Sequence, residues 1–413
     1  MKKVAVIGGG ISGLSISNLL QNSYDVKVFE KDLQPGGLIK CDRVEGNLYH
    51  KVGGHVFNSK REDVLSWFWK FFNKEHEFTK AIRNSIILMP DGKFIGYPIE
   101  NHVYMMDEAV VRNIIEDIFD NVKKKNYEPS NFKEFLLSRF GKTLYEIYFK
   151  PYNEKIWKQD LDKIPLSWLE GKLPMPTPEE IVFNNFNHVK EMNMVHSSFY
   201  YPKNNGSQFL ADRLAENLNI SYGVEIDQIT KEKYSWKIEN ELFDKVIFCG
   251  NIKTLPQILI GVDTSSYHSG IDSFDYHGTT SVLCEMSRNE YSWIYLPDSG
   301  YDTHRIICTG NFALSNNKSE EVRTATLEFT DYIEKEAILS QMKKNSFSLN
   351  YITHEYTKYT YPVQNKNTRE IVCSLKKNLE KDNFFLLGRF AEWEYYNMDA
   401  AIGAAIDLSK RIK

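Results

Sequence analysis

The stretch VAVIGGGISGLS, residues 4–15, decides the fold of the N-terminal part of the chain. Its first four residues are all apolar, which is typical of a strand buried on both faces of a parallel sheet. Three of its glycines have the spacing Gly8-x-Gly10-x-x-Gly13. In such a turn the first glycine permits the tight bend, the second lets the backbone approach a pyrophosphate, and the third lets the following helix pack on the strand. The stretch therefore predicts a strand, a turn and a helix that places its N-terminus at a phosphate group.

The residues that follow complete a strand–helix–strand unit. Leucine and isoleucine recur at helical spacing from Leu14 to Leu20, and residues 26–29 form a second largely apolar strand that ends at Glu30. An acidic residue at this point is placed to accept hydrogen bonds from an adenosine ribose. We therefore expect a Rossmann-like dinucleotide-binding unit. The alternative is a tight turn that binds no ligand.

Two further glycine segments favour FAD over NAD. Gly36 and Gly37 come shortly after Glu30 and resemble the second glycine signature of flavoproteins with two dinucleotide-binding domains. A late apolar strand leads into Gly388-Arg389 and then into a helix. In such flavoproteins the final helix points its N-terminus at the flavin pyrimidine, where negative charge on the reduced ring is stabilised. An NAD dehydrogenase does not need this element.

Composition excludes several classes of protein. A net charge of -4 over 413 residues gives no basic field, so nucleic acid is not an expected partner. The five cysteines include no CxxC pair, as expected of reduced thiols in a cytoplasmic protein. No apolar run is long enough to span a membrane, and we expect no signal peptide before the first strand. Aromatic residues make up 14% of the chain, which suits either clefts that stack flat ligands or an aromatic-rich core.

Hydrophobic periodicity predicts the elements in the rest of the chain. We expect helices in residues 61–72, 110–125 and 131–149, a hairpin over residues 86–98 with Asp91-Gly92 at its turn, strands in residues 225–229, 236–239, 243–249 and within 278–313, a buried strand over residues 383–390, and a closing helix from Met398. The predicted fold class is α/β: an FAD-binding Rossmann-like fold with an inserted helical lobe and an antiparallel sheet lobe. The predicted parts are residues 1–82, 203–265 and 370–413 for the FAD-binding domain, 101–195 for the helical lobe, and 83–100 with 266–369 for the sheet domain.

Four segments carry a resemblance to a known family: GGHVFNSK at residues 53–60, KPYNEKIWK at 150–158, SWIYLPDSGYDTHR at 292–305 and LGRFAEWEYYNMDAAIG at 387–403. In this order and spacing they resemble the UDP-galactopyranose mutases nearly end to end. The first segment is similar to a histidine loop that lies against the flavin. The resemblance implies that His55 lies near the flavin face and that Gly53 and Gly54 let the backbone approach the isoalloxazine.

The second and third segments are similar to the substrate site of that family. Tyr152 and Trp157 match its PYxxKxW signature, which helps to form a uridine pocket. Tyr295 and Arg305 match a Trp-x-Tyr-x-Pro segment followed by an arginine that holds the nucleotide diphosphate. An arginine fork suits paired phosphates better than a lysine does. Lys172 stands where the family has a second arginine, so the sequence departs from the family there.

The C-terminal segment completes the predicted site. Tyr361 in TYPV matches a tyrosine near the diphosphate, and Tyr395 matches one that contacts a substrate phosphate. The resemblance and the glycine motifs together predict cofactor contacts from Gly8, Gly10, Ile11, Ser12, Gly13, Glu30, Lys31, Gly37, Leu38, Gly53, Gly54, His55, Val224, Gly388, Arg389, Asn397 and Met398, substrate contacts from Tyr152, Trp157, Lys172, Tyr295, Arg305, Tyr361 and Tyr395, and catalytic roles for His55, Arg305, Lys172 and Arg389. No metal site is expected.

The resemblance implies a ring contraction, in which a nucleotide-linked hexopyranose becomes a hexofuranose. In the family, reduced FAD attacks the anomeric carbon through N5 and forms an N5–sugar C1 adduct while the nucleotide diphosphate leaves and returns. The expected substrate is UDP-galactose, with UDP-N-acetylgalactosamine or a dTDP-deoxyhexose left open, and the furanose would serve surface polysaccharide synthesis. An external reductant such as NAD(P)H is expected, and a homodimer is an open option.

Two other interpretations remain open at this stage. An FAD amine oxidase or desaturase shares the N-terminal motif and the C-terminal flavin segment, but it needs no cationic clamp for a diphosphate. A flavin-binding scaffold or degenerate mutase without chemistry is supported only by Lys172. Amine-dependent oxygen consumption favours the first, and binding of a UDP-sugar without conversion favours the second.

Overall fold

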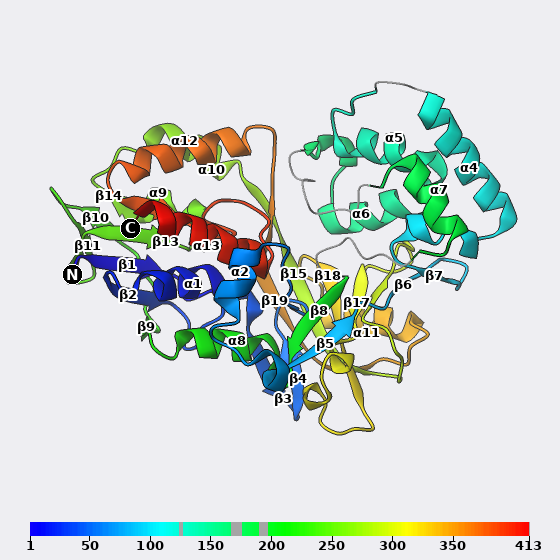
Figure 1. Cartoon of the computed structure of the whole chain (residues 1–413), viewed down its shortest axis with the longest axis horizontal. Coiled ribbons are helices and arrows are strands. Elements are labelled where there is room, and N and C mark those ends of the chain that lie inside the picture. Colours follow the sequence, from blue (N-terminus) through cyan, green and yellow to red (C-terminus); the bar gives the residue numbers. More distant parts are fainter. Residues whose placement is uncertain (124–126, 167–175, 190–196, 413) are drawn as a thin grey trace.

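The computed structural model describes residues 1–123, 127–166, 176–189 and 197–412 (Figure 1). Its elements form a parallel sheet with covering helices, a large mixed sheet, and a group of helices at the far end of the molecule. In the described residues no helix is both long and apolar enough to cross a bilayer.

The first sheet contains the predicted strand–helix–strand unit. Its strand order is β20-β13-β1-β2-β9, and every neighbouring pair is parallel. The strands are β1 (Lys3–Ile7), β2 (Asp25–Glu30), β9 (Asn219–Tyr222), β13 (Lys245–Phe248) and β20 (Phe384–Leu386). Val4 and Val6 face α1 (Ile11–Leu20) and α13 (Met398–Ile412), whereas Ala5 and Ile7 belong to the core on the other side. Because β1 is buried on both faces of the sheet, its sequence is a continuous apolar run.

The second face of this sheet is covered by a small sheet and by helices. The small sheet has the order β12-β11-β10-β14, with β10 (Ile229–Lys231), β11 (Trp236–Ile238), β12 (Glu241–Phe243) and β14 (Leu259–Ile260). Helices α9 (Leu255–Ile258), α10 (Ser265–Asp272) and α12 (Thr368–Glu380) complete this layer. The strand predicted over residues 225–229 is wrong apart from its last residue, because residues 224–228 run as irregular backbone past the end of β9.

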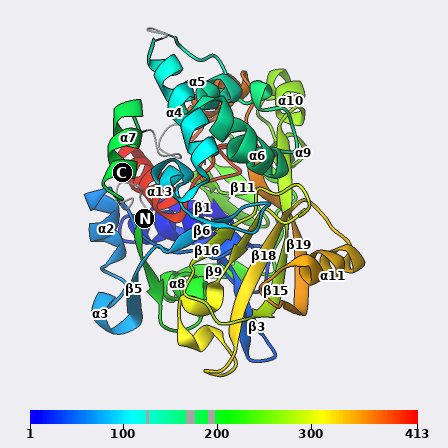
Figure 2. The same cartoon turned by 90° about the vertical axis from the view of Figure 1, so that its right-hand side faces the viewer.

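The large sheet has the order β19-β15-β18-β17-β16-β6-β7. Its strands are β6 (Ser85–Leu88), β7 (Phe94–Gly96), β15 (Asp275–Met286), β16 (Trp293–Tyr295), β17 (Arg305–Ile307), β18 (Arg323–Thr330) and β19 (Asn350–Val363). The predicted hairpin is confirmed as β6 and β7, but β6 pairs with β16 in parallel, so the sheet is not wholly antiparallel. One face of this sheet packs on α11 (Lys335–Lys344) (Figure 2), and the other belongs to the core that includes the helices around α5 (Phe132–Leu144).

Shorter elements join the two sheets. They are β3 (Cys41–Val44), β4 (Asn47–His50), α2 (Glu62–Phe68), α3 (Lys74–Glu77), β5 (Phe78–Ile82), β8 (Ser198–Pro202) and α8 (Gly206–Ala215). The chain segment between β4 and α2 carries the predicted histidine loop, and it lies where the parallel sheet meets the large sheet.

The remaining helices group at one end of the molecule, at the upper right of Figure 1. They are α4 (Glu108–Lys123), α5 (Phe132–Leu144), α6 (Lys150–Trp157) and α7 (Pro178–Phe186). The single helix predicted over residues 131–149 is interrupted at Gly141, whose φ of 84° is outside the helical region, and residues 145–149 form a π-helical turn. The closing helix from Met398 is confirmed as α13. The boundaries of the three predicted parts stay a prediction.

Candidate functional site

The glycine turn between β1 and α1 has the geometry that its spacing predicts. Gly8 has a φ of 108°, and a Cβ on Gly13 would lie 1.9 Å from the Gly8 carbonyl oxygen. The third glycine is therefore required by the packing of α1 on β1. The Leu14 amide donates a hydrogen bond to the Gly10 carbonyl oxygen. Gly10 has no side chain that could cap the amides before Leu14. The first-turn amides of α1 consequently face outward as potential anion donors.

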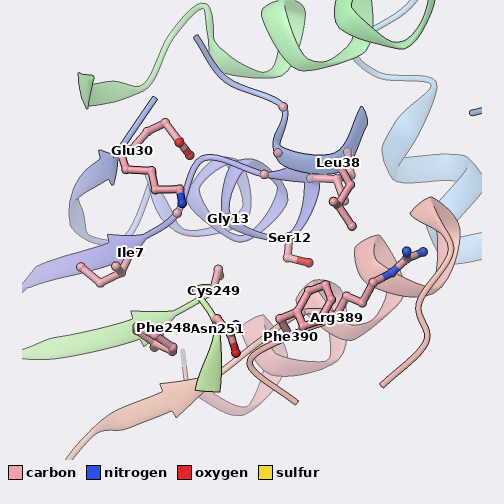
Figure 3. A pocket seen from close by; sticks show the side chains of 18 of the residues that line it. Ile7, Ser12, Gly13, Glu30, Leu38, Phe248, Cys249, Asn251, Arg389 and Phe390 are labelled. Carbon is pink, nitrogen blue, oxygen red and sulfur yellow. The ribbon is translucent and has the colours of Figure 1, made fainter. Parts of the chain in front are cut away.

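Glu30 closes the other side of this turn. Its carboxylate is buried and accepts hydrogen bonds from the amides of Gly9 (2.5 Å) and Asp32 (2.9 Å). A cavity extends from Glu30 past the turn to Arg389, and Figure 3 shows these two side chains at opposite ends. An elongated cavity with an acid at one end and open helix amides in the middle fits a dinucleotide.

Most predicted cofactor contacts line this first cavity. They are Gly8, Gly10, Ile11, Ser12, Gly13, Glu30, Lys31, Gly37, Leu38, His55, Val224, Gly388, Arg389 and Met398. Sequence reasoning missed the segment after β13, which contributes Cys249, Gly250 and Asn251 to the lining, and also Phe390 and Tyr396. Because ligands of parallel sheets lie at the carboxyl ends of the strands, the end of the strand predicted over residues 243–249 carried a usable signal.

A second cavity adjoins the first. Its lining is Val52, Gly53, Gly54, His55, Val56, Arg83, Trp293, Arg305, Glu328, Tyr361, Arg389, Tyr395, Asn397 and Met398. His55, Arg389 and Met398 line both cavities, so these three residues mark the point where the two cavities meet. The predicted cofactor residues Gly53, Gly54 and Asn397 belong to this second cavity.

The two glycines before His55 are required by the packing of the protein, and their approach to a flavin stays a prediction. A Cβ on Gly53, whose φ is 67°, would lie 2.4 Å from Glu328 Oε1, and a Cβ on Gly54 would lie 2.8 Å from Ile307 Cγ2. Both contacts come from the large sheet. The glycines therefore let the histidine loop pack against β17 and β18, which is a steric requirement of the protein itself.

His55 is held in a neutral form. Its Nε2 donates a hydrogen bond to the carbonyl oxygen of Leu38 at 3.0 Å. Burial and the charge of Arg389 together lower the pKa of His55 to about 4. At neutral pH the ring therefore offers a fixed dipole at the junction of the cavities and no net charge.

Arg305 is fixed by the large sheet. It is paired directly across β17 and β18 with Glu328, and its Nε donates to that carboxylate, while its Nη2 donates to the hydroxyl of Tyr361 at 3.1 Å. Burial would raise the pKa of Glu328, but the charge of Arg305 and hydrogen bonds from His304 and Arg305 outweigh it and lower this pKa to about 2. The pair therefore stays ionised and holds the guanidinium ready for a second anion.

Arg83 is the third arginine in the lining of this cavity, and sequence reasoning missed it. It lies just before β6, its Nε donates to Ser85 Oγ at 2.9 Å, and its Nη2 donates to the Tyr295 hydroxyl. Its guanidinium carbon lies 4.6 Å from the Trp293 ring centroid and 5.0 Å from that of Tyr97. Among the described residues no carboxylate pairs with it. No sequence motif marks Arg83, because it reaches the site only through the parallel pairing of β6 with β16.

The predicted substrate residues are placed in two groups. Tyr361 and Tyr395 line the second cavity with stacked rings 5.5 Å apart, and Arg389 lies over the Tyr395 ring. Tyr152 and Tyr295 lie in an aromatic cluster, where their centroids are 5.5 Å apart. Trp157 is buried at the end of α6. None of Tyr152, Trp157 and Tyr295 is in the cavity lining, and Lys172 lies outside the described residues.

The lining of the second cavity carries a net positive charge. Arg83, Arg305 and Arg389 contribute three positive charges to its lining and Glu328 one negative charge, which leaves two positive charges in balance. In the described part of the chain no cluster of histidine, cysteine or acidic side chains could hold a metal ion. The cavity therefore suits an anion of about two charges, which is the charge of a diphosphate esterified at both ends.

Comparisons with known proteins agree with this geometry. Residues 6–74 match the family described as the NAD(P)-binding Rossmann-like domain. The chain is 25% identical to dTDP-fucopyranose mutase of Escherichia coli, in an alignment that covers 99% of this chain and 98% of that protein. It is 21% identical to UDP-galactopyranose mutase of Mycoplasma genitalium, in an alignment that covers 99% of this chain and 94% of that protein. A crystal structure of reduced UDP-galactopyranose mutase superposes with a TM-score of 0.88 at 18% identity, covering 100% of this chain and 94% of that one. In sequence and in fold, these findings confirm that the chain resembles the UDP-galactopyranose mutases along its whole length.

Proposed function

We propose that this chain is an FAD-dependent mutase that interconverts a nucleotide-linked hexopyranose and hexofuranose. The observation that carries the proposal is the pair of adjoining cavities that share His55 and Arg389. One is built from the elements of a dinucleotide site, and the other is lined by arginines in excess over carboxylates.

The residues of the first cavity fit FAD. Glu30 would bind the adenosine ribose, the first-turn amides of α1 would bind the pyrophosphate, and the N-terminus of α13 at Met398 would face the flavin pyrimidine. A reduced flavin, when bound, supplies a nucleophile for the anomeric carbon of the sugar. His55, neutral and hydrogen-bonded to Leu38, would orient that ring without adding charge.

The residues of the second cavity would hold the diphosphate while its bond to the sugar breaks. Arg305 is already oriented by Glu328 and Tyr361, so little reorganisation is needed when negative charge develops on the leaving group. Arg83, which lies just before β6, would supply a second guanidinium to the same cavity. The leaving diphosphate would thus stay bound and return to the anomeric carbon, as an isomerisation requires.

The identity of the nucleotide stays open between uridine and thymidine. UDP-galactose is the first candidate, and the full-length relative that is a dTDP-fucopyranose mutase supports a dTDP-linked deoxyhexose as well. A reductant such as NAD(P)H would keep the flavin reduced, and the product would serve polysaccharide synthesis.

The test is to incubate dithionite-reduced, FAD-loaded protein with UDP-galactofuranose and dTDP-fucofuranose and to separate the products by chromatography. We expect the corresponding pyranose from at least one of them, and none from the oxidised protein. A reduced protein that binds these compounds without converting any would support a degenerate mutase. Oxygen consumption that depends on an added amine would support the oxidase interpretation instead.

A further inference from the structure

His277 lies in β15, outside the lining of both cavities, and joins three segments of the chain. Its Nδ1 lies 3.0 Å and 3.3 Å from the two carboxylate oxygens of Asp331, directly after β18. Its Nε2 lies 2.8 Å from the carbonyl oxygen of Trp157, the last residue of α6. One imidazole therefore connects the large sheet to the helix that carries Tyr152.

The partners of this ring fix its protonation. A carbonyl oxygen and a carboxylate can only accept hydrogen bonds, so both ring nitrogens have to donate. A neutral imidazole has a single N–H, and only the imidazolium ion has two. The geometry around His277 is thus complete only when the ring is protonated.

The sheet side of this contact is rigid. Asp331 also accepts a hydrogen bond from the amide of Gly278 at 2.9 Å, and its own amide donates to the Gly278 carbonyl at 2.9 Å. The hydroxyl of Thr360 donates to the His277 carbonyl at 3.0 Å. Because His277 and Asp331 are tied to each other through the sheet backbone, the Trp157 contact holds α6 to a fixed point.

Charged groups face this ring from every element around it. Burial disfavours the charged ring, but the hydrogen bond and charge of Asp331, the Trp157 carbonyl and the charge of Asp275 outweigh it and raise the pKa of His277 above its usual range. Lys158 and Tyr356 also face Asp331. The helix has a second attachment, since Lys155 donates to the carbonyl oxygens of Leu296 (2.7 Å) and Asp298, and burial lowers the pKa of Lys155 to about 8.

We propose that His277 is a positioning residue whose protonated ring fastens the C-terminal end of α6 to the large sheet and so sets Tyr152 against Tyr295 beside the second cavity. The consequence for nucleotide binding rests on the proposed function. The attachment itself does not.

The direction of the pH effect follows from the raised pKa. A group whose pKa is higher in the folded protein stabilises it fully below the unfolded pKa, and this contribution is lost as the pH rises through the folded value. The attachment of α6 by His277 should therefore weaken as the pH rises through the folded pKa. Lys155 loses its charge in an alkaline range of its own, so the part played by His277 has to be measured as a difference between variants.

The first measurement is nitrogen-15 NMR of the FAD-loaded protein with labelled histidine. We expect both ring nitrogens of His277 to carry a proton at pH 6.5. We expect the ring to lose one of these protons at a higher pH than a free histidine does. In Asp331→Asn the same deprotonation should occur at a lower pH than in the wild type. A His277 ring with one proton at pH 6.5 would overturn the proposal.

The second measurement compares His277→Gln, which is neutral, with His277→Arg, which keeps a positive charge and several donors. The control is His354→Gln, because the one side-chain hydrogen bond of His354 among the described residues joins it to Tyr351 within its own strand, β19. We expect His277→Gln to speed hydrogen exchange of the α6 amides and to weaken UDP binding about tenfold at pH 6.5, the effect of a lost charged hydrogen bond. We expect FAD content to stay unchanged and His277→Arg to restore both values.

The outcomes separate this inference from the proposed function. If His277→Gln matches His354→Gln in α6 exchange, the positioning role is wrong even when UDP binds normally. If the wild-type protein binds no UDP, the proposed function fails, and the α6 exchange alone then decides whether His277 holds the helix.

Discussion

At the scale of single residues, the second cavity depends on two arginines that are held in different ways. Arg305 is tied to the buried Glu328 and to Tyr361, whereas Arg83 is held by Ser85, Tyr295 and flanking aromatic rings, and no carboxylate of the part of the chain that the structure describes pairs with it. The sequence identified Arg305 through its distance from a Trp-x-Tyr-x-Pro segment. It could not identify Arg83, because the two residues meet only after β6 has paired with a strand some two hundred positions away.

Removing Arg305 should affect turnover most. We expect Arg305→Ala to lower kcat by a factor on the order of 10²–10³, as the loss of one preorganised charge contact does. Steady-state kinetics of the reduced protein measures this. Arg288→Ala removes an exposed arginine, bonded to the Glu320 carbonyl, and serves as the control. An Arg305→Ala variant within threefold of that control would remove Arg305 from the site.

Removing Arg83 should affect nucleotide binding. We expect Arg83→Ala to weaken UDP affinity about tenfold, because its guanidinium lines the cavity and pairs with no carboxylate among the described residues, so that it can contact the diphosphate. Arg83→Lys should recover only part of this, since an ammonium lacks the planar fork. Isothermal titration with UDP gives the constants, and equal affinities for all three proteins would contradict the assignment.

At the scale of elements, two glycines in the turn between β1 and α1 are needed for different reasons. A Cβ on Gly13 would collide with the Gly8 carbonyl, whereas a Cβ on Gly10 would meet only Gly37 Cα at 3.8 Å, an ordinary contact. Gly13 is therefore required by packing. Gly10 is required only if a ligand approaches the backbone.

These two glycines give a matched pair of variants. Gly13→Ala should lower both the melting temperature and the FAD content, because α1 has to shift away from β1. Gly10→Ala should leave the stability of the FAD-free protein near the wild-type value and still reduce FAD binding. Calorimetry and flavin absorbance measure the two properties. Full FAD binding by Gly10→Ala would show that no pyrophosphate lies against this turn.

The pairing of β17 with β18 gives a prediction about acid stability. The pKa of Glu328 is about 2 against an ordinary value of 4.5, so its stabilisation is complete above 4.5 and is lost as the pH falls through about 2.

Denaturant unfolding at a series of pH values tests this. We expect the free energy of unfolding of Glu328→Gln to be lower at pH 7 and to fall less steeply between pH 4.5 and 2 than that of the wild type. Glu321→Gln, at an exposed position before β18, should retain the wild-type slope. Parallel profiles for wild type and Glu328→Gln would show that the Arg305–Glu328 pair does not titrate in this range.

The elements also show which structural features can be predicted from the sequence and which cannot. The β1–α1–β2 unit, the β6–β7 hairpin and α13 follow from local patterns, since apolar periodicity and glycine spacing depend on neighbouring residues. The position of the histidine loop against a flavin stays a prediction, and the steric need for its two glycines, which arises from Glu328 and Ile307 far along the chain, has no local signal. The break at Gly141 reflects the close approach of Asp117 from α4, whose Cβ lies 2.5 Å from where a Cβ of Gly141 would be.

At the scale of the whole molecule, a site forms where three groups of elements meet. The parallel sheet provides the first cavity, the large sheet provides Arg305 and Glu328, and α6 brings Tyr152 to the Tyr295 side of the second cavity. His277 links α6 to β15, and the buried Lys155 links it to the segment that follows β16. Binding in the second cavity should therefore depend on how firmly α6 is held to that sheet.

The most direct test of this account is a crystal structure of the protein with reduced FAD and UDP bound. The account predicts the flavin along the glycine turn, its ring at His55 and Arg389, and the diphosphate oxygens within hydrogen-bonding distance of Arg305 and Arg83. A diphosphate that lies away from both arginines, or a flavin outside the first cavity, would contradict it.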